Sequence, residues 1–393
     1  MIYAAPPLGD IDESVLAMIG ALREDLRFFL HEPRRWTGSL RRAEFARAAR
    51  GSLSIEGYHT SVESAAAIID GEEPAEVSDE TRHAIAGYRE AMTCVLQLAP
   101  GAPDINVSLL LSLHFMMMRY DFSKHPGRWR PGAVWVTSSN GEVVYEAPDR
   151  ELVEPLVDEA LAQIAHSEGP APVTAAMAHL NLTLIHPFSD GNGRMARCLQ
   201  TLVLAAASEG ASEFVSIEEY LGANTAAYYA VLTEVARGTW SPQNSALPWI
   251  RFCLTAHYRQ ARTVLRRIRE LEALWDACEQ IARRHRLAPR TVGALVDAAR
   301  GWRLRRSLYV AITKATAGET ISGAVATSDL AAMARAGLLN PVGEKRGRFY
   351  APTEELTNPW QGIRSQRPPA DADDPYEIAR AGASAKPRLP GLG

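Results

Sequence analysis

Apolar residues recur every three or four positions along most of this chain, and this spacing predicts helices with one buried face. The pattern is clearest on either side of residue 186. Pro187 disfavours a helical conformation at His186, so we expect one helix to end at Ile185 and a second to begin just beyond a tight turn. The first stripe comprises Val173, Ala176, Met177, Leu180 and Leu184, and the second comprises Cys198, Leu199, Leu202, Val203 and Ala206.

One segment departs from the helical pattern. Two short β-prone runs, 134–136 and 143–145, flank a polar stretch that contains Asn140-Gly141. That dipeptide favours a hairpin turn, so we predict a hairpin over about 133–146 in an otherwise mostly α-helical protein. A two-stranded hairpin is barely stable alone, and it therefore needs a packing or functional reason.

The turn at 186–197 concentrates residues that suit an anion. A helix start presents unpaired N–H groups and the positive end of a dipole. Gly191 and Gly193 lack a Cβ, so an anion can approach the backbone there. Arg194 and Arg197 follow three residues apart on the new helix. We interpret this set as a polyphosphate site.

Two further residues of the turn add chemistry. Asp190 offers a hard oxygen ligand suited to Mg²⁺, and His186 can take a proton from a hydroxyl near neutral pH. The alternative is a capped turn with surface arginines and a satisfied histidine. That alternative accounts for each residue alone but not for all of them together.

The pattern His-Pro-Phe-x-Asp-Gly-Asn-Gly-Arg-x-x-Arg resembles the signature of the Fic family at every specified position. This resemblance implies transfer of AMP from ATP to a Ser, Thr or Tyr hydroxyl of a target protein, or of the chain itself. The related Doc-type pattern transfers a phosphate and has a lysine at Gly193. In the implied site, His186 is the general base, Asp190 holds Mg²⁺, the residues Gly191, Asn192, Gly193 and Arg194 hold the α- and β-phosphates, and Arg197 receives the γ-phosphate.

A second motif lies upstream. Ser52, Glu56 and Gly57 match the inhibitory pattern (Ser/Thr)-x-x-x-Glu-(Gly/Asn) of the family. The resemblance implies that Glu56 pairs with Arg197 where the γ-phosphate would sit. A carboxylate can form such a bidentate pair with a guanidinium. The alternative is an ordinary glutamate at a helix end.

The resemblance also gives the hairpin and an aromatic pair a role. Fic proteins carry a hairpin flap that aligns a target segment by strand addition, and backbone pairing makes few side-chain demands. Here the flap residues would be Val134, Trp135, Val136 and Thr137, although a hairpin without function is the alternative. Tyr228 and Tyr229 are expected near the adenine and ribose, with core packing equally open, and His114 and His179 are expected to be core histidines.

The chain divides by composition into four expected regions. The C-terminal part resembles a winged helix, a module that binds DNA or docks proteins. Arg335, Lys345, Arg346 and Arg348 allow DNA without requiring it, so DNA is not favoured. The regions are 1–100 with the inhibitory motif, 101–257 as the Fic core, 258–352 as helical linker and winged-helix-like unit, and 353–393 as a partly disordered tail.

Composition limits the possible partners and the expected location of the protein. The 393 residues carry a net charge of −4, which excludes a broad basic field for nucleic acid, and the four cysteines have no paired spacing. No segment reaches membrane-spanning length, so we expect a cytoplasmic protein. Two rival functions stay open: removal of AMP or another nucleotidyl transfer at the same site, and a DNA-binding regulator with a nucleotide-sensing core. A homodimer also stays open, because Fic proteins often self-associate.

Overall fold

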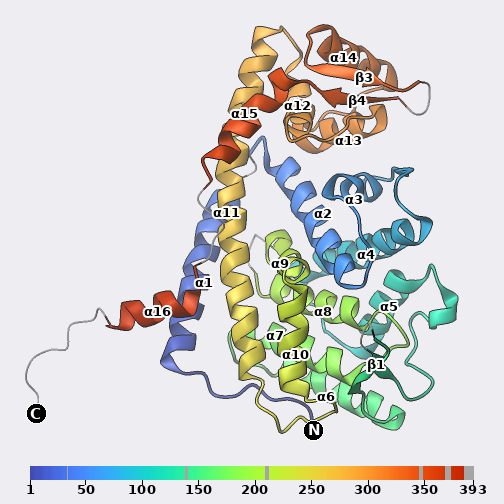
Figure 1. The fold of residues 1–393 in the computed structure, drawn as a ribbon, viewed down its shortest axis with the longest axis vertical. Helices are drawn as coiled ribbons and strands as arrows, with labels where there is room; N and C mark the ends of the chain where they lie inside the picture. The colour runs from blue at the N-terminus through green and yellow to red at the C-terminus, as the bar shows by residue number, and fades with distance from the viewer. Residues whose placement is uncertain (33, 138–139, 209–211, 345–347, 368–372, 385–393) are drawn as a thin grey trace, which may run out of the picture.

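The computed structural model describes the chain apart from residues 33, 138–139, 209–211, 345–347, 368–372 and 385–393. It confirms a mostly α-helical protein, in which two small sheets of two strands each stand among the described residues (Figure 1). None of the described helices has the length and apolar character needed to cross a membrane. Short 3₁₀ helices are η1 (Ala99–Gly101), η2 (Phe122–Lys124), η3 (Arg150–Leu152), η4 (Ser212–Phe214) and η5 (Pro289–Thr291).

The longest element is α11 (Leu247–Arg284), a helix of 38 residues that extends along the long axis of the molecule (Figure 1). At 1.5 Å per residue it is about 57 Å long. Its first turns pack in one apolar cluster beside the motif helices, and its later turns pack in a second cluster with the C-terminal elements. The boundary predicted at residue 257 therefore falls inside a continuous helix. Beyond Pro248 the helix contains no glycine or proline that would interrupt it.

The N-terminal region is helical, as predicted, and its second helix crosses the core at very short range. A Cβ built on Gly51 would lie 2.4 Å from the carbonyl oxygen of Glu218, and one on Gly222 would lie 2.4 Å from that of Gly51. Two glycines therefore allow the backbones of α2 and α9 to touch. The helices of this region are α1 (Asp10–Leu30), α2 (Thr37–Ile55), α3 (Val62–Ile69) and α4 (Asp79–Leu98).

The central region holds the two helices predicted around residue 186 and the predicted hairpin. The hairpin pairs β1 (Trp135–Thr137) with β2 (Val143–Glu146) in antiparallel register, with Trp135 opposite Glu146. Residues 138–139 of its turn lie outside the described residues. The helices are α5 (Val107–Met118), α6 (Val153–Ala165), α7 (Ala171–Ile185), α8 (Asn192–Ala206), α9 (Glu218–Ala223) and α10 (Thr225–Ala236).

The C-terminal region contains three helices and a ribbon of two strands, at the top of Figure 1. Residue 304 forms an additional isolated bridge to the second strand. Of the four basic residues that would allow DNA binding, Lys345 and Arg346 lie outside the described residues. The elements are α12 (Val292–Ala299), α13 (Arg306–Ala317), α14 (Gly323–Arg335), β3 (Leu339–Val342) and β4 (Phe349–Pro352).

The prediction of a partly disordered tail is wrong for two segments, α15 (Glu354–Ser365) and α16 (Pro375–Ser384). In α15, Leu356, Trp360 and Ile363 recur at helical spacing and pack against the second apolar cluster. The α16 helix extends outward from α1 (Figure 1), and Tyr376 near its start is buried. The many charged residues and prolines of this segment made these short helical patterns hard to recognise in the sequence.

We expect Gly51→Ala to lower the free energy of unfolding by about 1–3 kcal/mol, because its methyl group would meet backbone atoms of α9 that have no room to move. Gly20→Ala is the matched control. It lies in α1 with nothing within 4 Å of an added Cβ, so higher helix propensity should raise stability by up to about 1 kcal/mol. Urea unfolding followed by circular dichroism measures both. A Gly51→Ala protein as stable as wild type would contradict the close crossing.

Candidate active site

The motif forms a tight turn between α7 and α8. His186 ends α7 in the left-handed region, with φ 53°, and Gly191 precedes α8 with φ 79°. The Asn192 side chain clamps the turn, because its Oδ1 accepts from the N–H of Phe188 at 2.8 Å and its Nδ2 donates to the Phe188 carbonyl at 2.9 Å. The side chain of Asn192 is thus structural, and the start of α8 contributes backbone N–H groups to the site.

The imidazole of His186 is set up to accept a proton. Its Nδ1 lies 3.2 Å from the carbonyl oxygen of Thr183. A carbonyl only accepts, so Nδ1 carries the hydrogen and Nε2 is left as an acceptor. Burial lowers the pKa of His186, which keeps the ring neutral at physiological pH.

A second histidine positions the metal-ligand candidate. His114 Nδ1 accepts from the N–H of Gly127 at 2.9 Å, so its Nε2 donates to the Asp190 carbonyl at 3.1 Å. The His114 ring stacks on Phe188 with centroids 3.8 Å apart, and burial lowers its pKa to about 4. His114 is therefore a buried packing residue, as expected, that also fixes the backbone at Asp190.

Asp190 is the one motif carboxylate of this turn, and its side chain is 34% exposed. It accepts from the N–H of Gly191 and from Arg194 Nη2 at 3.1 Å. In the described part of the chain, no group of three or more His, Cys, Asp or Glu side chains could hold a metal ion. A Mg²⁺ ion here would have to take most of its oxygen ligands from a bound phosphate and water, which is the usual arrangement for this cation.

Both motif arginines are buried beneath the turn. Arg194 donates through Nη1 to the hydroxyl of Tyr120 at 2.9 Å and lies over the ring of Tyr58, 5.6 Å from its centroid. Arg197 donates through Nε to Ser52 Oγ at 2.8 Å and through Nη2 to the Ser52 carbonyl at 3.0 Å. Arg194 Nε and Arg197 Nη1 have no acceptor among the described residues. Buried N–H groups rarely lack an acceptor, and phosphate oxygens are suitable acceptors for guanidinium groups.

The structure brings Glu56 to this same place. Its Oε1 lies 2.6 Å from Arg197 Nη2. Burial alone would raise the pKa of the Glu56 carboxyl, but Arg197 and Arg194 outweigh burial and hold that pKa below its usual value. A Cβ on Gly193 would lie 2.5 Å from Glu56 Oε1, so only glycine leaves room for this carboxylate over the start of α8. Gly57, with φ 87°, directly follows Glu56 and ends the predicted inhibitory motif.

The hairpin is fixed to the same turn. The hydroxyl of Tyr145 in β2 donates to the carbonyl of Leu184 at 2.6 Å, and Leu184 is two residues before His186. Within the described residues, β1 pairs with β2 alone, and the side chain of Trp135 is 52% exposed. The outer edge of β1, where Val134, Val136 and Thr137 also lie, is thus available for strand addition close to the motif.

Arg130 is a site residue that the sequence reasoning missed. It is fully buried and bonds only to carbonyl groups in its recorded contacts: Nε donates to His186 at 2.9 Å, while the Nη atoms reach Gly132 and Pro148. It thereby ties both ends of the hairpin to the residue before Pro187. Arginine is so common in this chain that only its position before Pro131-Gly132 could have singled it out.

The two tyrosines predicted near the nucleotide are placed differently from one another. Tyr228 is 1% exposed, and its hydroxyl lies 3.0 Å from His179 Nε2 in the core. Tyr229 is 47% exposed, and its hydroxyl donates to the carbonyl of Ile55, next to Glu56. His179 is buried as expected, and burial lowers its pKa to about 3. Of the pair, Tyr229 has the accessible ring.

Curated relatives are similar to about half of this chain. The chain is 28% identical over 206 residues to "Protein adenylyltransferase fic-1" of Caenorhabditis elegans and over 199 residues to "Protein adenylyltransferase Fic" of Drosophila melanogaster. These alignments cover 51% and 49% of this chain and 39% of each relative. The chain thus spans about two fifths of the length of the curated relatives it matches.

Solved structures share the fold. A Fic family protein from Desulfovibrio desulfuricans superposes with a TM-score of 0.58 at 21% identity, covering 89% of this chain and 98% of the other. Fic-1 from C. elegans superposes with a TM-score of 0.51 at 23% identity, covering 65% and 72%. Residues 104–204 match the model of the Fic/DOC family. The turn, the fold and these similarities agree that residues 104–204 form a domain of the Fic/DOC type.

Proposed function

We propose that this protein is an adenylyltransferase that moves AMP from ATP to a Ser, Thr or Tyr hydroxyl of a target protein. One observation carries the proposal: the free Nε2 of a neutral His186 shares a turn with buried guanidinium groups that have N–H groups without acceptors. A base for a hydroxyl and donors for phosphates are what such a transfer requires. The names of the relatives in C. elegans and Drosophila support the same activity.

In the proposed reaction, the target hydroxyl gives its proton to His186 Nε2 while its oxygen bonds to the α-phosphorus of ATP. The bond from that phosphorus to the oxygen bridging to the β-phosphate breaks, and pyrophosphate leaves. Arg194 and the N-terminal N–H groups of α8 stabilise the charge that grows on the leaving group. Asp190 would hold Mg²⁺, whose charge neutralises the phosphates when it is bound. Tyr229 would pack on the adenine, and Tyr228 would support it from the core.

We infer that Glu56 restrains this reaction. Its carboxylate already occupies Arg197 and stands directly over Gly193, so the γ-phosphate cannot reach Arg197 while Glu56 stays. Because the pKa of Glu56 is depressed in the folded state, the carboxyl stays ionised at neutral pH and above, and the pair is lost only as the pH falls through that lowered value. Release therefore requires displacement of the 52–57 segment, since a fall in pH within the physiological range leaves the pair intact.

The C-terminal unit has the element order of a winged helix, and we infer that its partner is a protein. Several of its arginines pair with carboxylates, which reduces the charge that is available to the phosphates of DNA. In α14, Asp329 pairs with Arg290. The recorded ion pairs include Arg290–Asp329, Arg300–Asp297, Arg303–Glu63, Arg303–Glu76 and Arg305–Glu72.

Replacing His186 by alanine should lower AMP transfer by about 100- to 10,000-fold, the usual contribution of a general base. ATP affinity should stay within about twofold, because the base acts on the hydroxyl. Incorporation of radiolabelled AMP and equilibrium binding of ATP measure the two effects. The control His166→Ala removes an exposed histidine that bonds to its own helix, and it should behave as wild type. Equal transfer by wild type and His186→Ala would exclude the assigned role.

Glu56→Gly should raise AMP transfer by on the order of 100-fold, because a shift of about 1 Å in the reacting atoms costs roughly that factor. Removal of the carboxylate frees Arg197 for the γ-phosphate. Glu73→Gly, a change in an exposed loop, is the control and should leave the rate unaltered. If Glu56→Gly transfers AMP no faster than wild type, the proposed restraint by Glu56 is wrong. If the double variant Glu56→Gly with His186→Ala remains active, the proposed role of His186 as general base is wrong.

We expect Arg130→Met to lower transfer to a protein target by at least about tenfold while ATP binding stays within about twofold, since the hairpin loses its attachment to the turn. The neighbouring Arg128→Met removes an exposed arginine and should have no such effect. The readout is the KM for the target compared with the KM for ATP. A loss confined to ATP binding would contradict a positioning role of Arg130 on the hairpin.

A further inference from the structure

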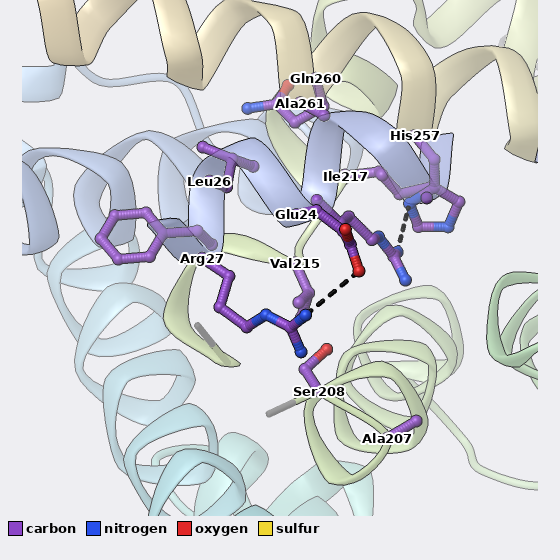
Figure 2. Close-up of a pocket in the computed structure, with 13 residues that line it drawn as sticks. Glu24, Leu26, Arg27, Ala207, Ser208, Val215, Ile217, His257, Gln260 and Ala261 are labelled. Carbon is purple, nitrogen blue, oxygen red and sulfur yellow. Dashed lines mark hydrogen bonds and ion pairs between the residues drawn. The ribbon is translucent and has the colours of Figure 1, made fainter. Parts of the chain in front are cut away.

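A cavity of about 230 Å³ lies away from the motif turn, between α1, α11 and the chain that connects α8 to α9 (Figure 2). Ala207 and Ser208 at its floor follow the C-terminal end of α8, about 22 Å along that helix from the motif. None of the proposed active-site residues lines it. Its lining residues are Gly20, Arg23, Glu24, Leu26, Arg27, Ala207, Ser208, Phe214, Val215, Ile217, His257, Gln260 and Ala261.

Arg23 is a cation that no described carboxylate neutralises. Its one recorded hydrogen bond joins Nη2 to Nδ1 of His257 at a long 3.5 Å, drawn as the dashed line that ends on His257 in Figure 2. Burial lowers the pKa of the guanidinium to about 10, and no neighbouring acid raises it again. Arginines buried in this protein otherwise tend to have carboxylate or carbonyl partners, as Arg42 and Arg267 do.

His257 adds a second donor without an acceptor. Arginine can only donate, so Nδ1 of His257 accepts from Arg23 and the hydrogen of the neutral ring must lie on Nε2. This Nε2 is buried and has no partner among the described residues. Burial, with a smaller contribution from Arg23, lowers the pKa of His257 well below its usual value, so the ring is neutral. Arg23 therefore supplies the positive charge, and the imidazole supplies a buried donor.

The other lining residues indicate the charge, polarity and size of a ligand that would fit the cavity. Glu24 and Arg27 pair with each other at 3.1 Å (Figure 2), which leaves Arg23 as the net charge of the cavity and favours a monoanion. The wall formed by Leu26, Val215 and Ile217 is apolar. The volume lies below the roughly 300–1,000 Å³ of pockets for drug-sized ligands.

We propose that this cavity is a binding site for a small organic carboxylate with a short apolar body. The carboxylate pairs with Arg23, and the apolar body lies against Leu26, Val215 and Ile217. A carboxylate has two acceptor oxygens, which suit the guanidinium of Arg23, whose one recorded partner is a ring nitrogen of His257 at 3.5 Å. Without it, the protein keeps a partly desolvated charge that costs stability.

Butyrate is a suitable probe, and histidine resonances report on the cavity directly. Protein labelled with ¹³Cε1-histidine is titrated with sodium butyrate at constant ionic strength, and the signal that disappears in His257→Gln is assigned to His257. We expect a saturable shift of this signal with butyrate. The neutral isostere butyramide and inorganic phosphate should each bind at least about tenfold more weakly, and sodium chloride should produce no saturable shift.

Arg23→Met should abolish the butyrate-dependent histidine shift, whereas Arg283→Met, which removes an exposed charge from the same helix as His257, should retain it. Without butyrate, Arg23→Met should melt at or above the temperature of wild type, because it removes an unpaired buried charge. Binding of butyramide or chloride equal to that of butyrate would overturn the proposal. So would an unchanged shift in Arg23→Met, or a loss of several degrees in its melting temperature, which would make Arg23 a structural residue.

Discussion

The fully buried guanidinium of Arg197 constrains the rest of this structure. A buried charge is costly unless it has acceptors, and the recorded acceptors of Arg197 are Ser52 in α2 and Glu56 directly after it, more than 100 residues earlier in the chain. The α2 helix must therefore pack directly against the motif region, and Gly51 and Gly222 make that approach sterically feasible. The proposed phosphate site and its proposed restraint by Glu56 therefore both depend on the packing of the 52–57 segment against Arg197.

Three histidines near the site show how hydrogen bonds assign roles to one residue type. Each is partly or fully buried and has a lowered pKa. His114 and His179 use both ring nitrogens for protein partners, which commits them to structure. His186 uses Nδ1 alone in its recorded contacts, so Nε2 has no recorded partner. The sequence predicted His114 and His179 as core histidines and His186 as a base, and the hydrogen bonds distinguish the first two from the third.

The sequence was sufficient for the local features of the site. The turn at 186–197, the hairpin and the match of Ser52, Glu56 and Gly57 to a known pattern depend on neighbouring residues, which periodicity and glycine placement reveal. Contacts across the fold were not predictable in this way. Arg130 and Tyr120 are an ordinary arginine and tyrosine until folding places them beside His186 and Arg194. The two helices of the tail were not predicted for another reason. Three apolar residues at helical spacing within a charged segment are too weak a pattern to indicate a helix.

The single helix α11 contributes side chains to two apolar clusters, one beside the motif turn and one in the C-terminal unit. A linker between two bodies would let each move without the other, but a shared helix behaves as a rigid lever. The helix is about 57 Å long, and its first turns pack against α7 while its last turns pack against the C-terminal elements. A tilt of a rigid helix of this length at one end displaces the other end, so the two clusters cannot reorient independently while α11 stays straight.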